Sequence, residues 1–526
     1  MNHDHRDHRD HDNRDHDNRG FDIAARFVET AREYPDRPAI SHGELTLSYR
    51  EVLAEVEQYA AALAKAVPTG HCVGLSVRKS PSAVVLMLAC LLARVPYVPI
   101  DPSAPLPRRL QILSDADPLL LLVSAGTVAN WPGHEFAGPE SLGVTGADSG
   151  PAVARRDRAA GSAAFGELDL AYVLYTSGST GAPKGVMISA RNACYFVDWA
   201  GRAFPLGPPD RVAQHAPLHF DLPVYDVFVA LTSGACLHLM DERTVLLPTA
   251  VHRFLRDRAI TAAYAVPSAL NAMVQRSAFR QDGLPDLRQL LFAGEEYHVP
   301  LLRELVAGLP EQTVVANLYG PVETNVVTWT TVDAPALAGP RVPIGRAVRG
   351  TEVAVLGEDG VPRSSSGQGE LLVCGPSVSP GYLNDPVKTA QTRLSAGPDG
   401  AGHSYYRTGD FGRIDAEGVV HFQGRRDGMV KTRGFRVELG DVEAALSGHP
   451  DVLQAAVLPS DRPDIGTVLV AHVAAVPGSG LTPAGLRKWV GERLPSYMVP
   501  ADVTLHQELP VTSTGKIARA ALGEPR

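Results

Sequence analysis

The stretch that decides the fold of this chain is Leu174-Tyr-Thr-Ser-Gly-Ser-Thr-Gly-Ala-Pro-Lys-Gly-Val186. It carries glycines, several hydroxyl side chains and one lysine, directly after a largely apolar run over residues 168–174. Because glycine lets the backbone adopt positive φ and approach a ligand closely, such a loop can direct N–H groups and hydroxyls at a phosphate chain. It is not a Walker A loop, which needs Gly-Lys followed by Ser or Thr, whereas Lys184 is followed by a glycine. A flexible Gly/Ser turn without a ligand is the alternative interpretation.

The composition indicates a globular protein with more than one domain. At 526 residues the chain is too long for one ordinary core, and its 44% hydrophobic and 20% charged content is typical of globular proteins. A net charge of −9 offers no basic surface for nucleic acid. The five cysteines show no metal or redox spacing, so we expect reduced thiols and a cytoplasmic location. The longest apolar stretch, residues 83–98, is broken by Arg94 and too short to span a bilayer, so no membrane partner is expected.

The first twenty residues stand apart from the rest of the chain. Residues 1–20 consist almost wholly of His, Asp, Asn and Arg in a near-repeat, without the apolar region of a signal peptide. His-rich tracts can bind metal, but a disordered, solvated tail is the simpler expectation. We therefore exclude this segment from the fold.

Hydrophobic patterning predicts an α/β fold for most of the chain. Strand-like runs over residues 262–266, 287–292 and 314–318 alternate with helical stretches over residues 224–231 and 300–309. Such alternation is typical of sheets with mostly parallel strands, covered by helices. We expect a large N-terminal domain of this kind.

Two smaller units are expected toward the C-terminus. Short strands over residues 352–356 and 370–374 predict a small β-rich subdomain within the N-terminal domain, whose bounds we place at residues 21–425. The charged, glycine-bearing stretch 425–436 resembles a hinge. Residues 426–526 are then expected to form a small α+β C-terminal domain. Residues 144–167, rich in Gly, Ala and Ser, are expected to be a surface connection.

Further motifs occur along the chain in a characteristic order. They are residues 45–51 (Leu-Thr-Leu-Ser-Tyr-Arg-Glu), 97–101 (Tyr-Val-Pro-Ile-Asp), 317–323 (Asn-Leu-Tyr-Gly-Pro-Val-Glu), 406–410 (Tyr-Arg-Thr-Gly-Asp), 424–431 (Gly-Arg-Arg-Asp-Gly-Met-Val-Lys), 433–440 (Arg-Gly-Phe-Arg-Val-Glu-Leu-Gly), 494–500 (Leu-Pro-Ser-Tyr-Met-Val-Pro) and 510–516 (Pro-Val-Thr-Ser-Thr-Gly-Lys). Together with the loop after Leu174, this ordered set resembles the adenylate-forming superfamily, which includes acyl-CoA synthetases, luciferases and the adenylation domains of nonribosomal peptide synthetases. The resemblance covers about residues 21–522.

The resemblance implies that a carboxylate attacks the α-phosphate of ATP and releases pyrophosphate. Two negatively charged reactants must be neutralised as they meet, and Lys516 is expected to bridge the substrate carboxylate and the α-phosphate. Glu323 is expected to hold Mg²⁺, which prefers oxygen ligands and bridges phosphates. Asp410 is expected to bind the ribose, Tyr319 to face the adenine, and Arg425 to lie near ribose and phosphate. The β- and γ-phosphates are expected to lie against the loop residues Thr176, Ser177, Gly178, Thr180 and Lys184.

The resemblance also implies a mobile C-terminal domain. Asp427 and Lys431 are identified with the hinge, about which one face presents Lys516 for adenylation and another admits a phosphopantetheine thiol. The chain departs from the family at two positions, with Val322 where the family usually has Thr and Met429 where it usually has Gln. The first removes a hydroxyl near the phosphates, and the second changes local contacts of the hinge.

The class of carboxylate follows from Asp221. In amino-acid-activating members of the family, an Asp at this position pairs with the substrate ammonium. Asp221 lies in an apolar run, where a carboxylate needs a cation. Alternatively, Asp221 is the N-cap of a helix. In that case the whole chain would be interpreted as an acyl- or aryl-CoA ligase. We favour the ammonium partner.

Alignment of the motifs suggests that the substrate pocket has uncharged walls. The expected wall residues are Leu222, Tyr225, Ala265, Leu291, Ala293, Leu318, Val326 and Val327, closed by Asp221 and Lys516. A charged substrate side chain would find no partner there, so we expect a small or medium apolar amino acid. The pattern is similar to that of prolyl adenylation enzymes, from which Tyr225 and Ala265 differ, and proline is the first guess.

We expect a freestanding enzyme of natural-product biosynthesis that loads a separate carrier protein. No Ser-bearing carrier segment follows Lys516 in the sequence. A catalytically silent nucleotide-binding protein is the remaining alternative, and the joint presence of Lys184, Glu323, Asp410 and Lys516 argues against it.

Overall fold

The structure of the chain is a computed structural model. It describes residues 22–131, 134–142, 151–155, 165, 168–177, 183–395, 404–425, 429–462, 466–476, 478–510, 517 and 519–522. Within these residues, no helix combines the length and the apolar character needed to cross a membrane.

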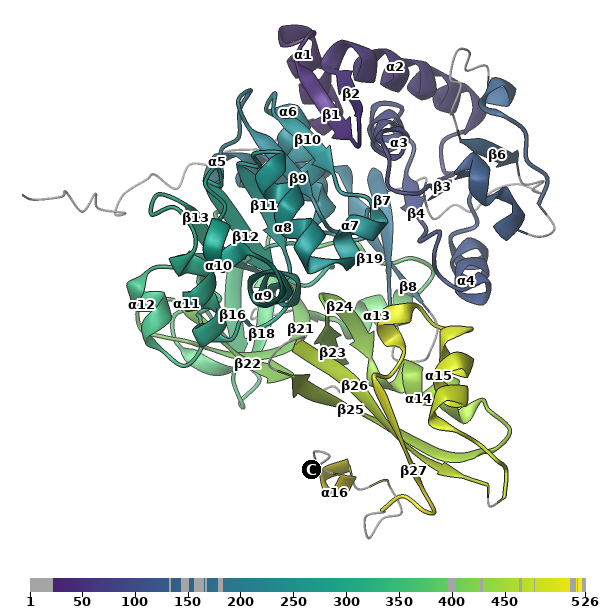
Figure 1. Ribbon diagram of the computed structural model, residues 1–526, viewed down its shortest axis with the longest axis vertical. Coiled ribbons are helices and arrows are strands. Elements are labelled where there is room, and N and C mark those ends of the chain that lie inside the picture. Colours follow the sequence, from purple (N-terminus) through teal and green to yellow (C-terminus); the bar gives the residue numbers. More distant parts are fainter. Residues whose placement is uncertain are drawn as a thin grey trace, which may run out of the picture.

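Two large sheets form the centre of the N-terminal part (Figure 1). In the described residues the first sheet has nine strands, in the order β15 (Arg346–Ala347), β14 (Thr328–Thr331), β13 (Val314–Tyr319), β12 (Gln289–Ala293), β11 (Ala262–Ala265), β9 (Arg211–Gln214), β10 (Cys236–Leu239), β1 (Pro38–His42) and β2 (Leu45–Ser48). Its central strands, from β13 to β1, run parallel. The predicted strands over residues 262–266, 287–292 and 314–318 correspond to β11, β12 and β13.

The second sheet contains the decisive stretch of sequence. Its seven described strands follow the order β19 (Gly381–Tyr382), β8 (Lys184–Ser189), β7 (Leu170–Thr176), β4 (Tyr97–Pro99), β3 (Val73–Ser76), β5 (Leu120–Val123) and β6 (Ala152–Arg155). Strand β7 is apolar because both of its faces are covered, and its first five residues are buried. Strand β6 corrects the expectation of a surface connection over residues 144–167, since Ala152–Arg155 pairs with β5.

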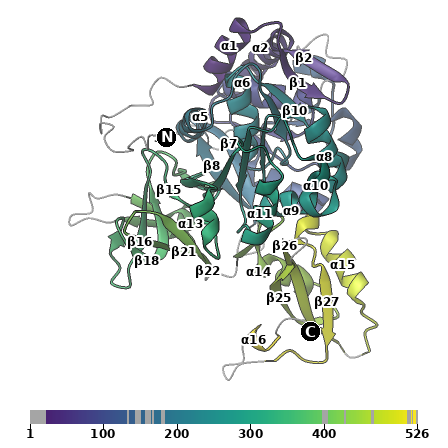
Figure 2. The same ribbon diagram turned by 60° about the vertical axis from the view of Figure 1, so that its left-hand side comes forward.

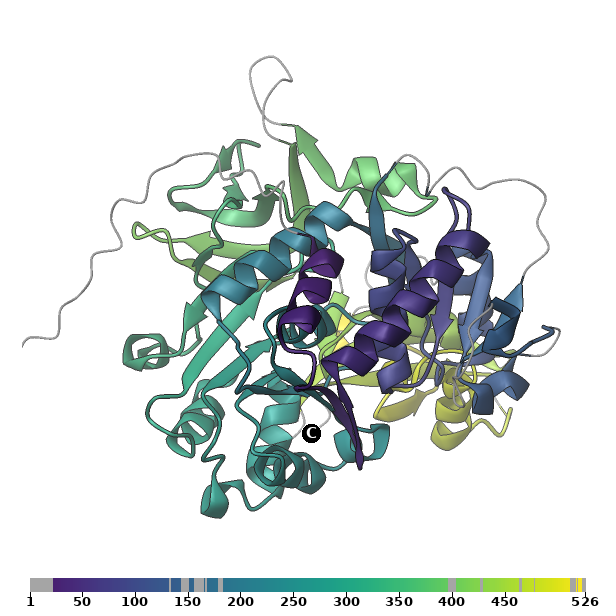
Figure 3. The same ribbon diagram turned by 90° about the horizontal axis from the view of Figure 1, so that it is seen from above.

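Helices join the two sheets through one large hydrophobic core. This core takes residues from both sheets and from α1 (Ile23–Glu33), α2 (Tyr49–Ala66), α3 (Pro81–Leu92), α5 (Ala190–Ala203), the π-helical segment η3 (Val224–Val229) and α6 (Ala230–Thr232). Helices α1 and α2 lie at the top of the molecule in Figure 1, so these purple helices face the viewer in Figure 3. The other face of the nine-stranded sheet is covered by α8 (Pro248–Asp257), α9 (Pro267–Arg276) and α11 (Val299–Ala307).

Shorter helices connect these layers. They are α4 (Leu106–Ala116), η1 (Ala125–Asn130), η2 (Pro139–Leu142), α7 (Glu242–Leu246), α10 (Phe279–Asp282), α12 (Ala334–Ala338) and α13 (Pro386–Gln391). Helix α4 covers the seven-stranded sheet, where Ile112 and Leu113 pack with Val98 and Val173.

The predicted β-rich subdomain is a third sheet beside the first two (Figure 2). It has six strands among the described residues: β17 (Pro362–Arg363), β16 (Glu352–Leu356), β18 (Gly367–Cys374), β21 (Ser404–Ile414), β20 (Arg393–Ser395) and β22 (Val420–Arg425). Strand β21 carries Asp410, and β22 ends at Arg425, opposite Asp410 in the ladder.

The C-terminal part has its own small α+β core, shown in yellow-green and yellow (Figure 1). It contains the hairpin β23 (Met429–Thr432) and β24 (Phe435–Glu438), the sheet β25 (Val452–Arg462), β26 (Gly466–Ala475) and β27 (Asp502–His506), and the helices α14 (Leu439–Ser447), α15 (Pro483–Gly491), η4 (Ser496–Met498) and α16 (Arg519–Leu522). The helices expected over residues 440–446 and 482–494 are α14 and α15. The fold class predicted from sequence is therefore confirmed.

Candidate active site

The expected phosphate loop connects two paired strands. Thr176 at the end of β7 lies opposite Lys184 at the start of β8, and the helix that follows, α5, begins only at Ala190. This strand–loop–strand geometry differs from a Walker A loop, where a helix follows directly. Arg108 donates from Nη2 to the carbonyl oxygen of Thr176 at 3.3 Å. Gly178 and Thr180, also expected in this site, lie outside the described residues.

Lys184 lies among charges of both signs. Its pKa is lowered by burial and by the charges of Lys388 and Arg436, while the carboxylates of Glu438 and Asp441 partly offset this. Lys184 and Lys388 together supply positive charge that suits a polyanion. Lys388 and Arg436 were not among the residues expected from sequence.

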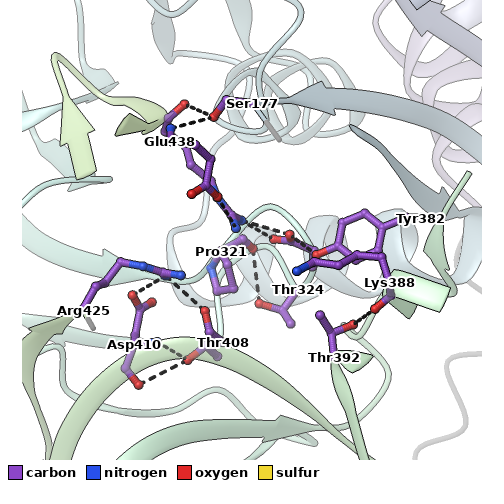
Figure 4. Close-up of polar contacts among 12 residues, drawn as sticks. Ser177, Pro321, Thr324, Tyr382, Lys388, Thr392, Thr408, Asp410, Arg425 and Glu438 are labelled. Atoms are coloured by element: carbon purple, nitrogen blue, oxygen red, sulfur yellow. Dashed lines mark hydrogen bonds and ion pairs between the residues drawn. The ribbon is translucent and has the colours of Figure 1, made fainter. Parts of the chain in front are cut away.

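A second group of polar residues surrounds Asp410. Its Oδ2 accepts a hydrogen bond from the Tyr319 hydroxyl at 2.5 Å. Its Oδ1 pairs with Nη1 of Arg425 at 2.6 Å (Figure 4). Arg425 also donates to the carbonyl oxygen of Thr408 at 3.0 Å. Asp410 is only 3% exposed, so these donors fix the direction of its carboxylate. The structure thus brings together three residues predicted to bind the nucleoside, and it uses the Tyr319 hydroxyl to orient Asp410.

Glu323 is almost fully buried between two donors. The Tyr382 hydroxyl donates to Oε1 at 2.7 Å, and Nη1 of Arg436 lies 2.9 Å from Oε1 and 3.1 Å from Oε2. Burial raises the pKa of Glu323, but the charge of Arg436 and the Tyr382 hydrogen bond outweigh it, and the net pKa is lowered. Glu323 is therefore ionised, and Arg436 is the cation that balances its charge in this structure.

The C-terminal hairpin contributes to the site. The Ser177 hydroxyl donates to the carbonyl oxygen of Arg436 at 2.8 Å and accepts from the Glu438 N–H at 3.3 Å (Figure 4). Lys431, expected only as a hinge residue, has its pKa lowered by burial and raised in part by the carboxylates of Asp410 and Asp221. No local pattern marks Arg436 as a site residue, because it reaches the site only through docking of the two domains.

Asp221 lies just before the π-helical segment η3. The N-cap residue of η3 is Pro223, and no side chain provides a cap hydrogen bond there. Burial raises the pKa of Asp221, and Lys431 and the N–H groups of residues 221 and 222 partly offset this. The capping role that would have explained Asp221 without a ligand therefore lacks support, and a cationic partner would relieve the cost of its burial.

Most of the expected wall residues pack in one cluster. Leu222, Tyr225, Leu291, Ala293, Leu318 and Val326 all belong to the large core between the sheets. The Tyr225 hydroxyl donates to Oε1 of Gln289 at 3.1 Å, in the interior, so it is engaged by protein. These residues therefore contribute mainly apolar surface to the cluster.

The prediction that Ala265 lines this wall is wrong. Tyr264 on β11 is in register with Leu291 on β12, and side chains in register on parallel strands share a face. Ala265 is in register with Phe292 and packs with it on the opposite face, under α9 and α11. Tyr264 takes the position in the wall, and the alternation of side chains along β11 was the signal that could have identified it.

Val327 also packs away from the other wall residues. It is fully buried against Tyr319 and Ile344, at the β-rich sheet, because its neighbour Val326 takes the core-facing direction. Tyr264 packs edge-on against the Tyr225 ring, with centroids 5.8 Å apart. Burial raises the pKa of Tyr264 well above its usual value, and the Asp221 charge adds to the effect, so the phenol near Asp221 is neutral.

Lys516 and the expected hinge residue Asp427 lie outside the described residues. Of the described candidates, the carboxylates Asp221, Glu323 and Asp410 all interact with residues of the segment 429–438. The arrangement combines uncharged, mainly apolar core residues with the carboxylate of Asp221, a second carboxylate held by Tyr319, and a lysine at the end of the expected phosphate loop. Chemically, these groups suit an apolar molecule with a positive charge and a molecule that carries phosphate groups.

Comparison with known proteins supports this reading. A family model described as AMP-binding enzyme matches residues 27–383, and one described as AMP-binding enzyme C-terminal domain matches residues 441–516. The chain is 38% identical to an L-proline–[L-prolyl-carrier protein] ligase of Pseudomonas fluorescens, covering 94% of this chain and 98% of the relative. It is 34% identical to the protein of the same name from Streptomyces coelicolor, covering 94% and 95%. A solved holo protein of nonribosomal peptide synthesis, containing adenylation and PCP domains, matches with a TM-score of 0.79 and 27% identity over 95% of this chain and 84% of that chain.

Proposed function

The chain belongs to the AMP-binding enzyme family and is an adenylate-forming ligase, and we propose that it activates L-proline or a similar small apolar amino acid. The product of this step is an aminoacyl adenylate, with release of pyrophosphate. The observation that carries the proposal is Asp221, a half-buried carboxylate beside apolar residues that makes no capping bond to its helix. Desolvation raises its pKa in spite of the charge of Lys431, and a substrate ammonium would stabilise the ionised form further.

The size of the substrate follows from the residues around Asp221. Tyr264, Leu222 and Leu318 close the wall with bulky side chains, and Tyr225 fills the space behind Tyr264. A small ring such as that of proline matches a short apolar wall without hydrogen-bonding needs. The names of the two relatives, both proline–carrier protein ligases, support the same assignment.

The nucleotide is proposed to bind along the edge formed by the two large sheets and the β-rich sheet. Asp410, held by Tyr319 and Arg425, accepts hydrogen bonds from the ribose hydroxyls. The β- and γ-phosphates lie against Thr176, Ser177, Gly178, Thr180 and Lys184. Lys184 at the end of the loop supplies positive charge for them.

The residues present also fit Mg²⁺. Glu323 is an ionised oxygen donor beside the phosphate loop, and among the described residues no cluster of three or more His, Cys, Asp or Glu side chains could hold a metal by itself. Glu323 would therefore hold the ion together with phosphate oxygens and water, as Mg²⁺ prefers. When bound, the ion neutralises charge on the phosphates during attack at the α-phosphorus.

The second step is proposed to use the C-terminal domain, residues 426–526, with Asp427 in the hinge. Lys516 bridges the amino acid carboxylate and the α-phosphate during adenylation. The domain then turns, and the phosphopantetheine thiol of a separate carrier protein attacks the adenylate to form a thioester and AMP. The carrier fits the names of the relatives and the adenylation–PCP protein. We place the enzyme in the cytoplasm, in keeping with its scattered free cysteines.

The test is ATP–pyrophosphate exchange with a panel of acids. Proline, pipecolate, alanine, valine, a β-amino acid and amine-free acids such as cyclopentanecarboxylate should be compared under equal conditions. We expect exchange with proline and little with its amine-free analogue, because only the amine pairs with Asp221. Exchange confined to amine-free acids would instead support an acyl- or aryl-CoA ligase.

A further inference from the structure

The hairpin β23–β24 lies on the groups that are proposed to hold the nucleotide. The hydroxyl of Ser177, in the proposed phosphate loop, donates a hydrogen bond to the Arg436 carbonyl at 2.8 Å and accepts one from the Glu438 N–H at 3.3 Å. Glu323, the proposed Mg²⁺ ligand, is engaged by both Arg436 contacts at 2.9 and 3.1 Å. Strand β24 therefore contacts both Ser177, which is proposed to bind phosphate, and Glu323, which is proposed to hold Mg²⁺.

A third contact seats the turn of this hairpin. Glu295 accepts from the Gly434 N–H at 2.6 Å and from the Ser268 N–H at 2.8 Å. Arg433 and Gly434 form the two-residue turn with positive φ values of 52° and 81°. A Cβ at Gly434 would lie 2.4 Å from Val266, so only glycine permits this close approach. The hairpin is thus docked by specific contacts along its length.

At Glu323, the guanidinium of Arg436 and the proposed Mg²⁺ ion would compete for the same carboxylate. Glu323 is 1% exposed, and a buried carboxylate needs one positive partner. The guanidinium of Arg436 already satisfies both oxygens of Glu323. A Mg²⁺ ion at the same oxygens would face that guanidinium at contact distance, and the two positive charges would repel each other.

We propose that Arg436 is a positioning residue that replaces Mg²⁺ at Glu323 after pyrophosphate has left, and thereby holds the hairpin docked for thiol transfer. The proposal rests on the proposed function, in which Glu323 holds the Mg²⁺ of ATP. Docking of Arg436 and binding of Mg²⁺–ATP are then antagonistic, and by linkage each weakens the other by the same factor. Departure of the metal with pyrophosphate frees Glu323, so Arg436 couples completion of the first step to docking for the second.

Removal of the competing cation should strengthen Mg²⁺–nucleotide binding. The apparent affinity for a ligand falls with the fraction of protein in the competent state, and Arg436→Met removes the contact that keeps the protein docked. We expect the full-length variant to bind a non-hydrolysable ATP analogue with Mg²⁺ about ten-fold more tightly than the parent in calorimetry. Arg436→Lys, which keeps the charge but replaces the planar guanidinium by a shorter ammonium group, should lie between the two.

The matched control is Arg493→Met. Arg493 stacks on Trp489 and pairs with Glu492 within the C-terminal domain, so its loss should leave nucleotide binding unchanged. In single-turnover transfer from preformed prolyl adenylate to pantetheine, Arg436→Met should be at least ten-fold slower, with partial rescue in Arg436→Lys. A general folding defect would weaken nucleotide binding as well, whereas the proposal requires the two effects to have opposite signs.

Hydrogen exchange on the parent protein tests the same point without a substitution. Mg²⁺ with the ATP analogue should accelerate amide exchange over residues 429–438, and the analogue without Mg²⁺ should do so much less. Unchanged exchange, or unchanged analogue affinity in Arg436→Met, would overturn the inference. Glu323→Gln distinguishes a failure of the proposed function from a failure of this inference. If analogue binding by Glu323→Gln depends on Mg²⁺ as strongly as in the parent, the proposed metal role of Glu323 fails. If the Mg²⁺ dependence is lost in Glu323→Gln but Arg436→Met binds the analogue like the parent, only the inference about Arg436 fails.

Discussion

Tyr264 and Leu291 stand side by side, in register, on the face of the nine-stranded sheet that packs in the large core. Their neighbours in the chain, Ala265 and Phe292, face the opposite side. Because successive residues of a strand point to opposite faces, we expect Tyr264, and not Ala265, to line the proposed substrate pocket.

Tyr264→Ala should therefore change substrate choice. Removal of the ring leaves a cavity beside Leu291, and we expect kcat/KM for proline to fall by roughly ten- to hundred-fold, while larger apolar amino acids improve. Ala265→Gly is the matched change on the other face, and it should lower stability without altering selectivity. The exchange panel measures both, and equal selectivity of the parent and Tyr264→Ala would contradict this placement.

Asp221→Asn should remove recognition of the amine. An amide cannot balance the charge of a buried ammonium, and an unpaired buried charge costs about 3–5 kcal/mol, which corresponds to roughly a hundred- to thousand-fold in kcat/KM. The KM for ATP should change little. The measurement compares kcat/KM for proline and for cyclopentanecarboxylate in the parent and in the variant. An equal loss of kcat/KM for both acids would show that Asp221 does not contact the amine.

Lys516→Ala should abolish adenylation with little effect on ATP binding. The lysine is proposed to bridge carboxylate and α-phosphate, and its charge is needed most where negative charge develops. We expect exchange to fall by roughly a hundred-fold or more, with the nucleotide affinity measured by calorimetry within about two-fold of the parent. Transfer from preformed prolyl adenylate should persist, and undiminished exchange would refute the role.

The charges of Lys79 and Asp226 influence each other's pKa in the interior of the N-terminal part. Nζ of Lys79 donates to the carbonyl of His215 at 2.8 Å, and burial lowers its pKa to about 8. Both carboxylate oxygens of Asp226 lack a hydrogen-bond partner among the described residues, and burial raises its pKa well above the usual value. Lys79→Met alone should destabilise the protein by about 3 kcal/mol, whereas Lys79→Met with Asp226→Leu should recover most of it. Chemical denaturation of the single and double variants measures this, and additive losses would contradict it.

His238 should make stability depend on pH. Burial, together with Arg211 and Arg258, lowers its pKa from 6.5 to about 4. The folded state therefore disfavours the proton, so the contribution is complete above pH 6.5 and is lost as the pH falls toward 4. The loss amounts to about 3 kcal/mol for this one group. His238→Gln should flatten the change of the thermal midpoint between pH 7 and 4.5; an equally steep change would point to other groups.

Part of the fold was readable in the sequence because it depends on local pattern. The largely apolar run over residues 168–174 forms β7, whose first five residues are buried. The stretches predicted to be helical over residues 300–309 and 440–446 form α11 and α14. Strand β6 was missed because it lies in a Gly/Ala-rich region, where its pairing with β5 rather than its own pattern determines the structure.

The candidate site could also be predicted only in part from the sequence. Motif spacing identified Asp221, Glu323 and Asp410 one by one, but not the partners that orient them. Tyr382 lies 59 residues from Glu323 in the chain, and Arg436 lies 113 residues away. Such pairs arise only when separate sheets and domains pack together, and no local pattern encodes them.

The amino-acid sequence by itself determined the reaction class, the order of the sheets' component strands along the chain, and the kinds of charge that the site contains. Tertiary structure alone decided that Tyr264 rather than Ala265 packs in the large core, and that Arg436 holds Glu323. Covalent geometry makes side chains alternate along every strand, but which of the two faces packs in this core depends on packing between distant elements. Likewise, a buried carboxylate requires a cation, but the cation that meets it is chosen by how the two domains dock.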